Sequence, residues 1–385
     1  MKSIETKNVE SAGSVESVEN VENVENVVGI TVEKLARSLI RALRPYESKV
    51  VPDCLKLDAN ENPFPWPEGM KEDLLSQKVA LTRYPDGSAI ELRKAISEYT
   101  GVPAEGILVG NGSDELIQLL LAVFGGEEKA LLVHPPTFSM YYAAAKVTGT
   151  GIKEVPLIGG ISLDTEKMVE VGSLPEVNVI IVCSPNNPTG TLYPRQEILK
   201  IVQETGKIVI VDEAYSEFAG ESLINEISNY PNLIVMRTFS KAFGLAGLRL
   251  GYLLGQPSTI ELINRARQPF NVNAFSQKAG VVALKYLREY QEQIEVLKVE
   301  IADLAAELGR IPGIQVFQTR ANFVLFKPDN PDEWAKAFAE KGFMVRNMGE
   351  LPVIGKALRV SSGTPQENEL FKKAIREIAV ERGSI

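Results

Sequence analysis

Residues 237–252 read RTFSKAFGLAGLRLGY, and the one lysine of this stretch, Lys241, lies among small residues just after an apolar run. The run Leu233–Met236 predicts a buried strand, so Lys241 follows the carboxyl end of that strand. In open α/β sheets, ligands bind outside the carboxyl ends of the strands. A lysine held there can bond to a carbonyl-bearing cofactor, although a lone Ser-Lys pair is more often a solvated surface feature.

Two other apolar runs also end in polar residues. Asn187 follows the run 177–182, and Asp212 and Tyr215 follow the run 208–211. Both runs are apolar enough to be central parallel strands. A buried carboxylate at the end of a strand is costly unless a cation pairs with it, and a protonated pyridine nitrogen is such a cation. A helix N-cap or a salt-bridged loop residue is the alternative interpretation of Asp212.

A candidate phosphate site precedes another predicted helix. The segment GNGSDE, residues 110–115, comes before the apolar helical pattern of residues 116–123. Small residues at a helix N-terminus leave backbone N–H groups free to bind an anion, and a guanidinium offers a planar fork for phosphate. A plain helix N-cap is the alternative. We assign to this phosphate site Gly112, Ser113, Asp114, Thr238, Ser240 and Arg249.

The motif SKAFGLAGLRLG, residues 240–251, resembles the lysine motif of the fold-type I aminotransferases that use pyridoxal 5'-phosphate. The resemblance is greatest to the histidinol-phosphate aminotransferase group and covers the chain except its N-terminal tail. It implies that Lys241 bonds to the cofactor and later acts as general base and acid. It also implies that Asp212 keeps the ring nitrogen protonated, while Asn187 and Tyr215 hydrogen-bond the phenolic oxygen of the ring.

The resemblance assigns roles to two aromatic residues in turns. Phe138 stands where the family commonly has a tyrosine stacked on the cofactor ring, so the flat face remains and the hydroxyl is lost. Tyr84 in the family reaches the cofactor phosphate of the neighbouring subunit, which implies a homodimer with shared active sites. From the residues alone, a tyrosine beside a proline in a turn is more often an ordinary surface residue.

Four residues are expected near the substrate. The family pattern brings Tyr46 and Asn60 to it, and Arg359 resembles the residue that grips the substrate carboxylate. Arg346, with Tyr46, is expected to bind the substrate phosphate. Surface positions for the loop residues and for Arg346 remain open.

The resemblance implies exchange of an amino group between histidinol phosphate or imidazole acetol phosphate and 2-oxoglutarate or glutamate, in histidine biosynthesis. Related enzymes act on aromatic amino acids, and a threonine-phosphate decarboxylase shares most of the cofactor motifs. A regulatory protein with an aminotransferase-like domain is the non-enzymatic alternative. Such a protein normally carries an N-terminal helix-turn-helix module, for which residues 1–29 are too short and too acidic.

Composition excludes several other classes. The chain has 385 residues, of which 44% are hydrophobic, and its formal net charge of −9 disfavours nucleic-acid binding. Two cysteines and a single histidine, His134, provide neither a disulfide framework nor a histidine-rich metal site, and we expect His134 to be structural. No apolar span approaches the roughly 20 residues of a membrane helix. We therefore expect a cytoplasmic protein with no metal and no nucleic-acid partner, and the resemblance implies an enzyme with small-molecule substrates and pyridoxal 5'-phosphate as cofactor.

The expected fold class is α/β, with a mostly parallel central sheet flanked by helices and a second, smaller α+β domain. Capping boxes at Ser88 and Thr364 predict two helix starts, and an amphipathic helix is expected over residues 30–43. We expect four segments, namely a disordered acidic tail (1–29), an N-terminal arm with part of the small domain (30–60), a large cofactor-binding domain (61–285) and a small C-terminal domain with its linking helix (286–385).

Overall fold

The computed structural model describes residues 32–43, 45 and 53–383, and the chain divides into two compact units, residues 1–46 and 47–385. The described part of the smaller unit contains α1 (Val32–Leu35) and α2 (Ser38–Arg41). The single helix predicted over residues 30–43 is therefore wrong, because the backbone is extended at Arg37 (φ −57°, ψ 141°). Neither short helix has a buried residue, so no packed apolar face supports a longer one. The predicted tail lies outside the described residues.

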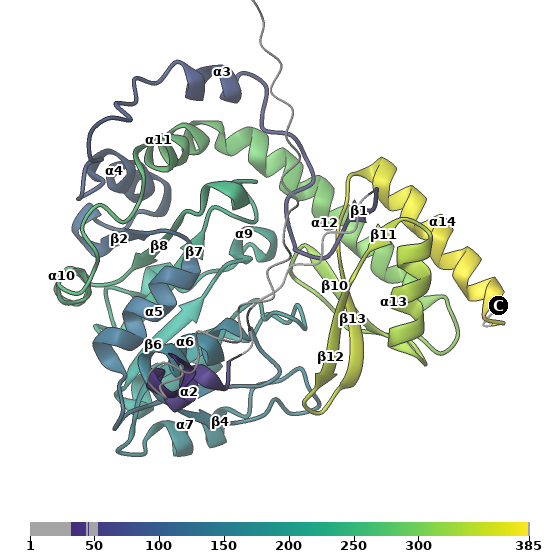
Figure 1. The fold of residues 1–385 in the computed structure, drawn as a ribbon, viewed down its shortest axis with the longest axis horizontal. Helices are drawn as coiled ribbons and strands as arrows, with labels where there is room; N and C mark the ends of the chain where they lie inside the picture. The colour runs from purple at the N-terminus through teal and green to yellow at the C-terminus, as the bar shows by residue number, and fades with distance from the viewer. Residues whose placement is uncertain (1–31, 44, 46–52, 384–385) are drawn as a thin grey trace, which may run out of the picture. The chain divides into compact units, whose positions relative to one another are not determined.

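A seven-stranded sheet is the centre of the larger unit, with the strand order β2-β8-β7-β6-β5-β3-β4 (Figure 1). Neighbouring strands are parallel except around β8, which is antiparallel to both β2 and β7. The mostly parallel sheet predicted from the apolar runs is thus confirmed. Its strands are β2 (Ile107–Gly110), β3 (Ala130–Val133), β4 (Gly151–Glu154), β5 (Val177–Cys183), β6 (Ile208–Asp212), β7 (Leu233–Thr238) and β8 (Gly251–Leu254).

Helices cover both faces of this sheet, because successive strand residues point to opposite faces and both sets are apolar. Full burial of each aliphatic side chain contributes about 1.5–3 kcal/mol. One face packs against α3 (Met70–Leu75), α4 (Ile90–Thr100), α7 (Thr165–Gly172), α8 (Arg195–Thr205), α9 (Ser216–Ala219) and α11 (Ala274–Ala283). The other face packs against α5 (Ser113–Phe124), α6 (Met140–Thr148) and α10 (Pro257–Asn264).

A smaller antiparallel sheet, with the order β12-β13-β10-β9, forms a second layered region. Its core contains Trp334, Phe338 and Phe371 from the helices packed on it and Phe326 from the sheet itself. The second, smaller α+β region is confirmed, whereas the domain boundaries stay a prediction. Its elements are α12 (Leu287–Gly309), β9 (Gln315–Val316), β10 (Phe323–Lys327), α13 (Pro331–Glu340), β12 (Arg346–Leu351), β13 (Gly355–Ser361) and α14 (Pro365–Glu381).

Short elements complete the larger unit. Strand β1 (Leu55–Lys56) pairs in parallel with β11 (Phe343–Met344), which joins the start of this unit to its C-terminal region. None of the helices in the described ranges is long and apolar enough to cross a membrane. The 3₁₀ turns are η1 (Ala104–Gly106), η2 (Ile224–Glu226), η3 (Ala246–Leu248) and η4 (Leu284–Tyr286).

The two predicted capping boxes have different outcomes. Thr364 forms one with the glutamate three residues further on. The box predicted at Ser88 is wrong, because Ala89 occupies the N-cap in a left-handed conformation (φ 47°). The carboxylate of Asp86 instead accepts hydrogen bonds from the N–H groups of Ser88 and Ile90, each at 2.8 Å. A carboxylate is a stronger acceptor than a hydroxyl, which explains why Asp86 caps this helix.

His134 and Cys183 belong to the interior of the central sheet. The imidazole Nε2 of His134 accepts a hydrogen bond from the backbone N–H of Cys183 at 3.1 Å. Burial lowers the pKa of His134 to about 4, so the ring is neutral at physiological pH. This arrangement fits the structural role expected for the histidine.

Candidate active site

Asp212 and Glu213, at the end of β6, point to opposite faces of the central sheet. Val209 and Val211 pack on the face covered by α8, whereas Ile210 packs on the face covered by α5 and α6. The alternation continues past the strand, so Asp212 shares the face of Ile210 and Glu213 shares the opposite face. The two carboxylates therefore belong to different sites.

Asp212 is 3% exposed and lies against helix α6. Its Oδ2 accepts a hydrogen bond from the Tyr141 hydroxyl at 2.6 Å, and its Oδ1 accepts one from the Ala214 N–H at 3.1 Å. Burial raises the pKa of Asp212 to about 6, and these two hydrogen bonds act in the opposite direction. The ring of Phe138 meets that of Tyr141 edge to face at 5.5 Å, which brings Phe138 to the same face.

Tyr141 was not among the predicted site residues. The chain has two adjacent tyrosines at this point, and the helix start that decides which one faces the sheet is not marked by an N-cap hydrogen bond. The available signal was spacing, since Tyr141 follows Phe138 by three residues and so lies on the same side of a helical turn.

Lys241 lies just beyond β7, as predicted. Its Nζ donates a hydrogen bond to the backbone carbonyl of Ala59 at 2.9 Å. Burial lowers the pKa of Lys241 to about 8, and the Arg359 guanidinium lowers it further in the same sense. A lysine with a lowered pKa has a larger neutral, nucleophilic fraction at physiological pH.

Residues from four distant segments meet beside Lys241. The Asn60 amide donates to the Tyr215 hydroxyl at 2.9 Å, and Nη1 of Arg359 donates to Oδ1 of Asn187 at 2.6 Å. The Arg359 guanidinium lies 5.3 Å from the centre of the Phe323 ring, against which Tyr215 also packs at 5.1 Å. The structure thus brings together Asn60, Asn187, Tyr215 and Arg359.

A second group surrounds the N-terminus of α5. Gly112 has φ +85°, and a Cβ built on it would lie 2.6 Å from Nη2 of Arg249. The positive φ favours glycine here, and a Cβ would displace the Arg249 guanidinium. Arg249 also pairs with Asp114 at 3.0 Å, and Ser113 is the first residue of the helix. No side chain caps α5 at Gly112, so the first N–H groups of the helix are available to an anion.

Thr238 and Ser240 extend this second group. Their hydroxyls are 3.0 Å apart, and the Ser240 N–H donates to Oγ1 of Thr238 at 3.1 Å. Thr238 lies opposite Gly251 in the β7–β8 ladder, and a Cβ on Gly251 would lie 2.9 Å from the backbone nitrogen of Ser113. The hydroxyl pair and the N-terminus of α5 are therefore neighbours.

The three remaining predicted site residues have different outcomes. Tyr84 is 82% exposed and stacks on Phe270 at 4.6 Å. Within the described ranges it has no contact with Lys241 or with the residues that meet beside Lys241. Arg346 is half-buried on β12, directly opposite Arg359 in the β12–β13 register. Tyr46 lies outside the described residues.

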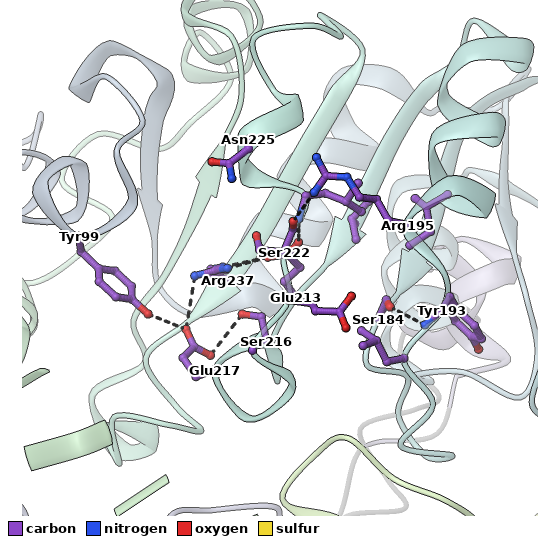
Figure 2. A pocket seen from close by; sticks show the side chains of 16 residues that line it. Tyr99, Ser184, Tyr193, Arg195, Glu213, Ser216, Glu217, Ser222, Asn225 and Arg237 are labelled. Atoms are coloured by element: carbon purple, nitrogen blue, oxygen red, sulfur yellow. Dashed lines mark hydrogen bonds and ion pairs between the residues drawn. The ribbon is translucent and has the colours of Figure 1, made fainter. Parts of the chain in front are cut away.

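A cavity of about 500 Å³ lies on the opposite face of the sheet, where Glu213 points (Figure 2). Nη2 of Arg237 pairs with Glu213 at 2.8 Å, and Nη1 lies 3.7 Å from Glu217, which also accepts from the Tyr99 hydroxyl at 3.3 Å. None of the described residues that we predicted for the site lines this cavity. Figure 2 shows Arg237 between its two acids, so the cavity wall is an ion-pair network.

The family described as "Aminotransferase class I and II" matches residues 52–375 of the chain. The chain therefore belongs to the class I and II aminotransferases, and its cofactor is pyridoxal 5'-phosphate.

Among individual proteins, the chain is similar to histidinol-phosphate aminotransferases. It is 60% identical to the histidinol-phosphate aminotransferase of Desulfitobacterium hafniense (strain Y51) over 91% of this chain and 98% of that protein. The crystal structure of the enzyme of that name from Clostridium acetobutylicum aligns with a TM-score of 0.77 at 26% identity, over 85% of this chain and 99% of the other. The fold is also shared with the Sinorhizobium meliloti enzyme, solved in complex with pyridoxal 5'-phosphate (TM-score 0.79, 22% identity, 89% and 97% coverage).

The residues present fit this cofactor. The Arg249 guanidinium lies against Gly112 at the N-terminus of α5, which places a cation beside helix N–H groups that suit a phosphate. Asp212 uses two of the roughly four acceptor positions of a carboxylate, so it can accept a further hydrogen bond from a protonated ring nitrogen. Lys241 offers an amine of lowered pKa within the same region.

Proposed function

We propose that the chain transfers the amino group of histidinol phosphate to 2-oxoglutarate, with imidazole acetol phosphate and glutamate as products, in histidine biosynthesis. The observation that carries this proposal is the 60% identity to a histidinol-phosphate aminotransferase over nearly the full length of both proteins. Use of glutamate and 2-oxoglutarate, which are metabolites of the cytoplasm, supports a cytoplasmic location.

We infer that the two residue groups described above hold the two ends of the cofactor. Arg249, the hydroxyls beside it and the first N–H groups of α5 would bind the phosphate, because they combine positive charge with free donors. Asp212 would accept from the ring nitrogen and Phe138 would stack on the ring. Asn187 and Tyr215 would hydrogen-bond the phenolic oxygen.

The chain's own residues supply binding and proton transfer. When bound, the pyridine ring withdraws electrons from the α-carbon of the substrate. The Lys241 amine, once freed by the substrate amine, would act as the base that takes the proton from the α-carbon and as the acid that gives it up again. Arg359, with its planar guanidinium, would bind the carboxylate of glutamate or 2-oxoglutarate. Arg346, together with Tyr46, would bind the phosphate of histidinol phosphate, and Asn60 would line the substrate position.

Substrate assays with purified protein test the function directly. Histidinol phosphate with 2-oxoglutarate should yield glutamate, and Lys241→Ala should lose both the covalent cofactor bond and nearly all turnover. Lys298→Ala is the matched control, because the ammonium of this half-buried lysine pairs with Glu295 on α12, away from the candidate site. Faster turnover of phenylalanine would favour an aromatic aminotransferase, and release of CO₂ from threonine phosphate would favour a decarboxylase.

We further propose a homodimer in which Tyr84 reaches the cofactor phosphate of the partner subunit. Tyr84 and Leu81 are about 80% exposed, and Phe270, which stacks on Tyr84, is 42% exposed, so large apolar side chains are available to a partner here. Light scattering measures the mass, and mixing Tyr84→Ala with Lys241→Ala chains tests sharing. Subunit exchange should create hybrid dimers with one intact site and restore part of the activity, and an inactive mixture despite exchange would contradict it.

A further inference from the structure

Two adjacent tyrosines of α6 make the same hydrogen bond in opposite surroundings. The Tyr141 hydroxyl donates to Oδ2 of Asp212 at 2.6 Å, with both side chains buried (0% and 3% exposed). The Tyr142 hydroxyl donates to Oε1 of Glu154 at 2.6 Å on the surface. Water can replace the surface bond of Tyr142 to Glu154 but not the buried bond of Tyr141 to Asp212. Loss of the Tyr141 hydroxyl therefore leaves a carboxylate oxygen of Asp212 without its donor.

The Tyr141 hydroxyl is a neutral donor to a carboxylate that has other acidic groups nearby. Glu213 follows it in the chain, Asp114 faces it from α5, and both add negative charge nearby. The thiol of Cys183 lies opposite on β5. Within the part of the chain that the structure describes, the carboxylate accepts from the Tyr141 hydroxyl and the Ala214 N–H, and both donors are neutral. Of these two, only the Tyr141 hydroxyl can be removed by a side-chain substitution.

A donor to a carboxylate lowers the affinity of that carboxylate for a proton. When a carboxylate and a ring nitrogen share one proton, a less basic carboxylate leaves more of that proton on the nitrogen. Without the tyrosine hydroxyl, the buried carboxylate becomes the better base and draws the proton away. The ring then loses the positive charge that makes it electron-withdrawing.

We propose that Tyr141 is a positioning residue whose hydroxyl, acting through Asp212, keeps the shared proton on the ring nitrogen of the bound cofactor. The inference rests on the proposed function, and specifically on the contact between Asp212 and that nitrogen. Tyr141 touches neither cofactor nor substrate in this assignment.

The test uses holoenzyme loaded with pyridoxal 5'-phosphate that carries ¹⁵N in the ring, because the ¹⁵N chemical shift distinguishes a protonated from a neutral pyridine nitrogen. In the unsubstituted enzyme and in Tyr142→Phe, the resonance should be that of the protonated ring. In Tyr141→Phe it should move toward the neutral position. The kcat of Tyr141→Phe should fall roughly 10- to 100-fold, as expected for loss of one charge-assisted hydrogen bond, with a smaller change in KM.

A second variant acts in the opposite direction and keeps the side chain's shape. Replacement of Tyr141 by 3,5-difluorotyrosine makes the hydroxyl a stronger donor, so the ring nitrogen should stay protonated to a higher pH than in the unsubstituted enzyme. An unchanged ¹⁵N shift in folded Tyr141→Phe, or an unchanged pH midpoint with the fluorinated residue, would overturn the role of Tyr141.

The same spectra separate this inference from the proposed function. A neutral nitrogen in the unsubstituted holoenzyme would overturn the contact with Asp212, and the inference with it. A protonated nitrogen that responds to both Tyr141 variants, in an enzyme that does not convert histidinol phosphate, would support the inference and refute only the substrate assignment.

Discussion

Arg237→Met should be one of the most destabilising single substitutions on the large sheet. The arginine is 8% exposed in its side chain and lies between Glu213 (2%) and Glu217 (7%), as Figure 2 shows. The two carboxylates outweigh the effect of burial and raise the pKa of Arg237 above its ordinary value. Methionine has a similar length, so the main change is loss of the cation and not of volume.

The expected cost is about 3–5 kcal/mol in the free energy of unfolding, because removal of one member of a buried ion pair leaves uncompensated charge. Acidification should reduce this cost. Burial already raises the pKa of Glu217, and loss of Arg237 raises it further above the unfolded value. The penalty is therefore full above the folded pKa and is relieved as the pH falls through it, when the acid takes up a proton.

Urea unfolding followed by circular dichroism, at pH 8 and at pH 5, measures both effects. Arg265→Met is the matched control, because Arg265 pairs with Glu261 on the surface, where the side chains are 69% and 71% exposed. Such exposed pairs contribute little, so the control should unfold with the unsubstituted protein. A midpoint shift for Arg237→Met no larger than that of the control would refute the reasoning.

Three other outcomes are expected. Gly112→Ala should weaken cofactor binding more than 10-fold in a fluorescence titration, because its Cβ would meet Nη2 of Arg249 at 2.6 Å. Gly101→Ala is the control: its φ of +75° gives a similar backbone cost, but nothing lies within 4 Å of its Cβ, so this variant should bind the cofactor normally. The rate at which cofactor-free protein forms its bond with pyridoxal 5'-phosphate should rise with pH and level off above about 8, since Lys241 loses its proton there, and a plateau near 10.5 would contradict its lowered pKa. Thr364→Ala should lower the free energy of unfolding by about 1 kcal/mol through loss of the capping box, which thermal unfolding would measure.

Strong local sequence patterns were sufficient to predict the elements that carry them. The apolar runs before Asn187, Asp212 and Lys241 became β5, β6 and β7, because a run buried on both faces has one stable placement in an α/β fold. Weak patterns failed where a competing interaction was stronger, as at Ser88, where the Asp86 carboxylate took the cap.

The pairing of site residues was harder to predict than their identity. Local patterns predicted a phosphate site from Gly112 and Arg249, and the structure places these two residues in close approach. These patterns did not indicate that Lys241 would contact the Ala59 carbonyl, 182 positions away in the chain. Contacts of that length depend on how whole elements pack, which no local period encodes.

The sequence by itself determined the fold class, the strand ends and the chemical types of side chain at each of them, because these depend on short-range periodicity and on the high cost of burying an unpaired charge. Only the tertiary structure decided which partners Asp212 and Glu213 meet on their opposite faces, namely Tyr141 for the first and Arg237 for the second. The physical reason is that the alternation of a strand is known from its residues, but the helix that covers each face is known only once the sheet has been packed.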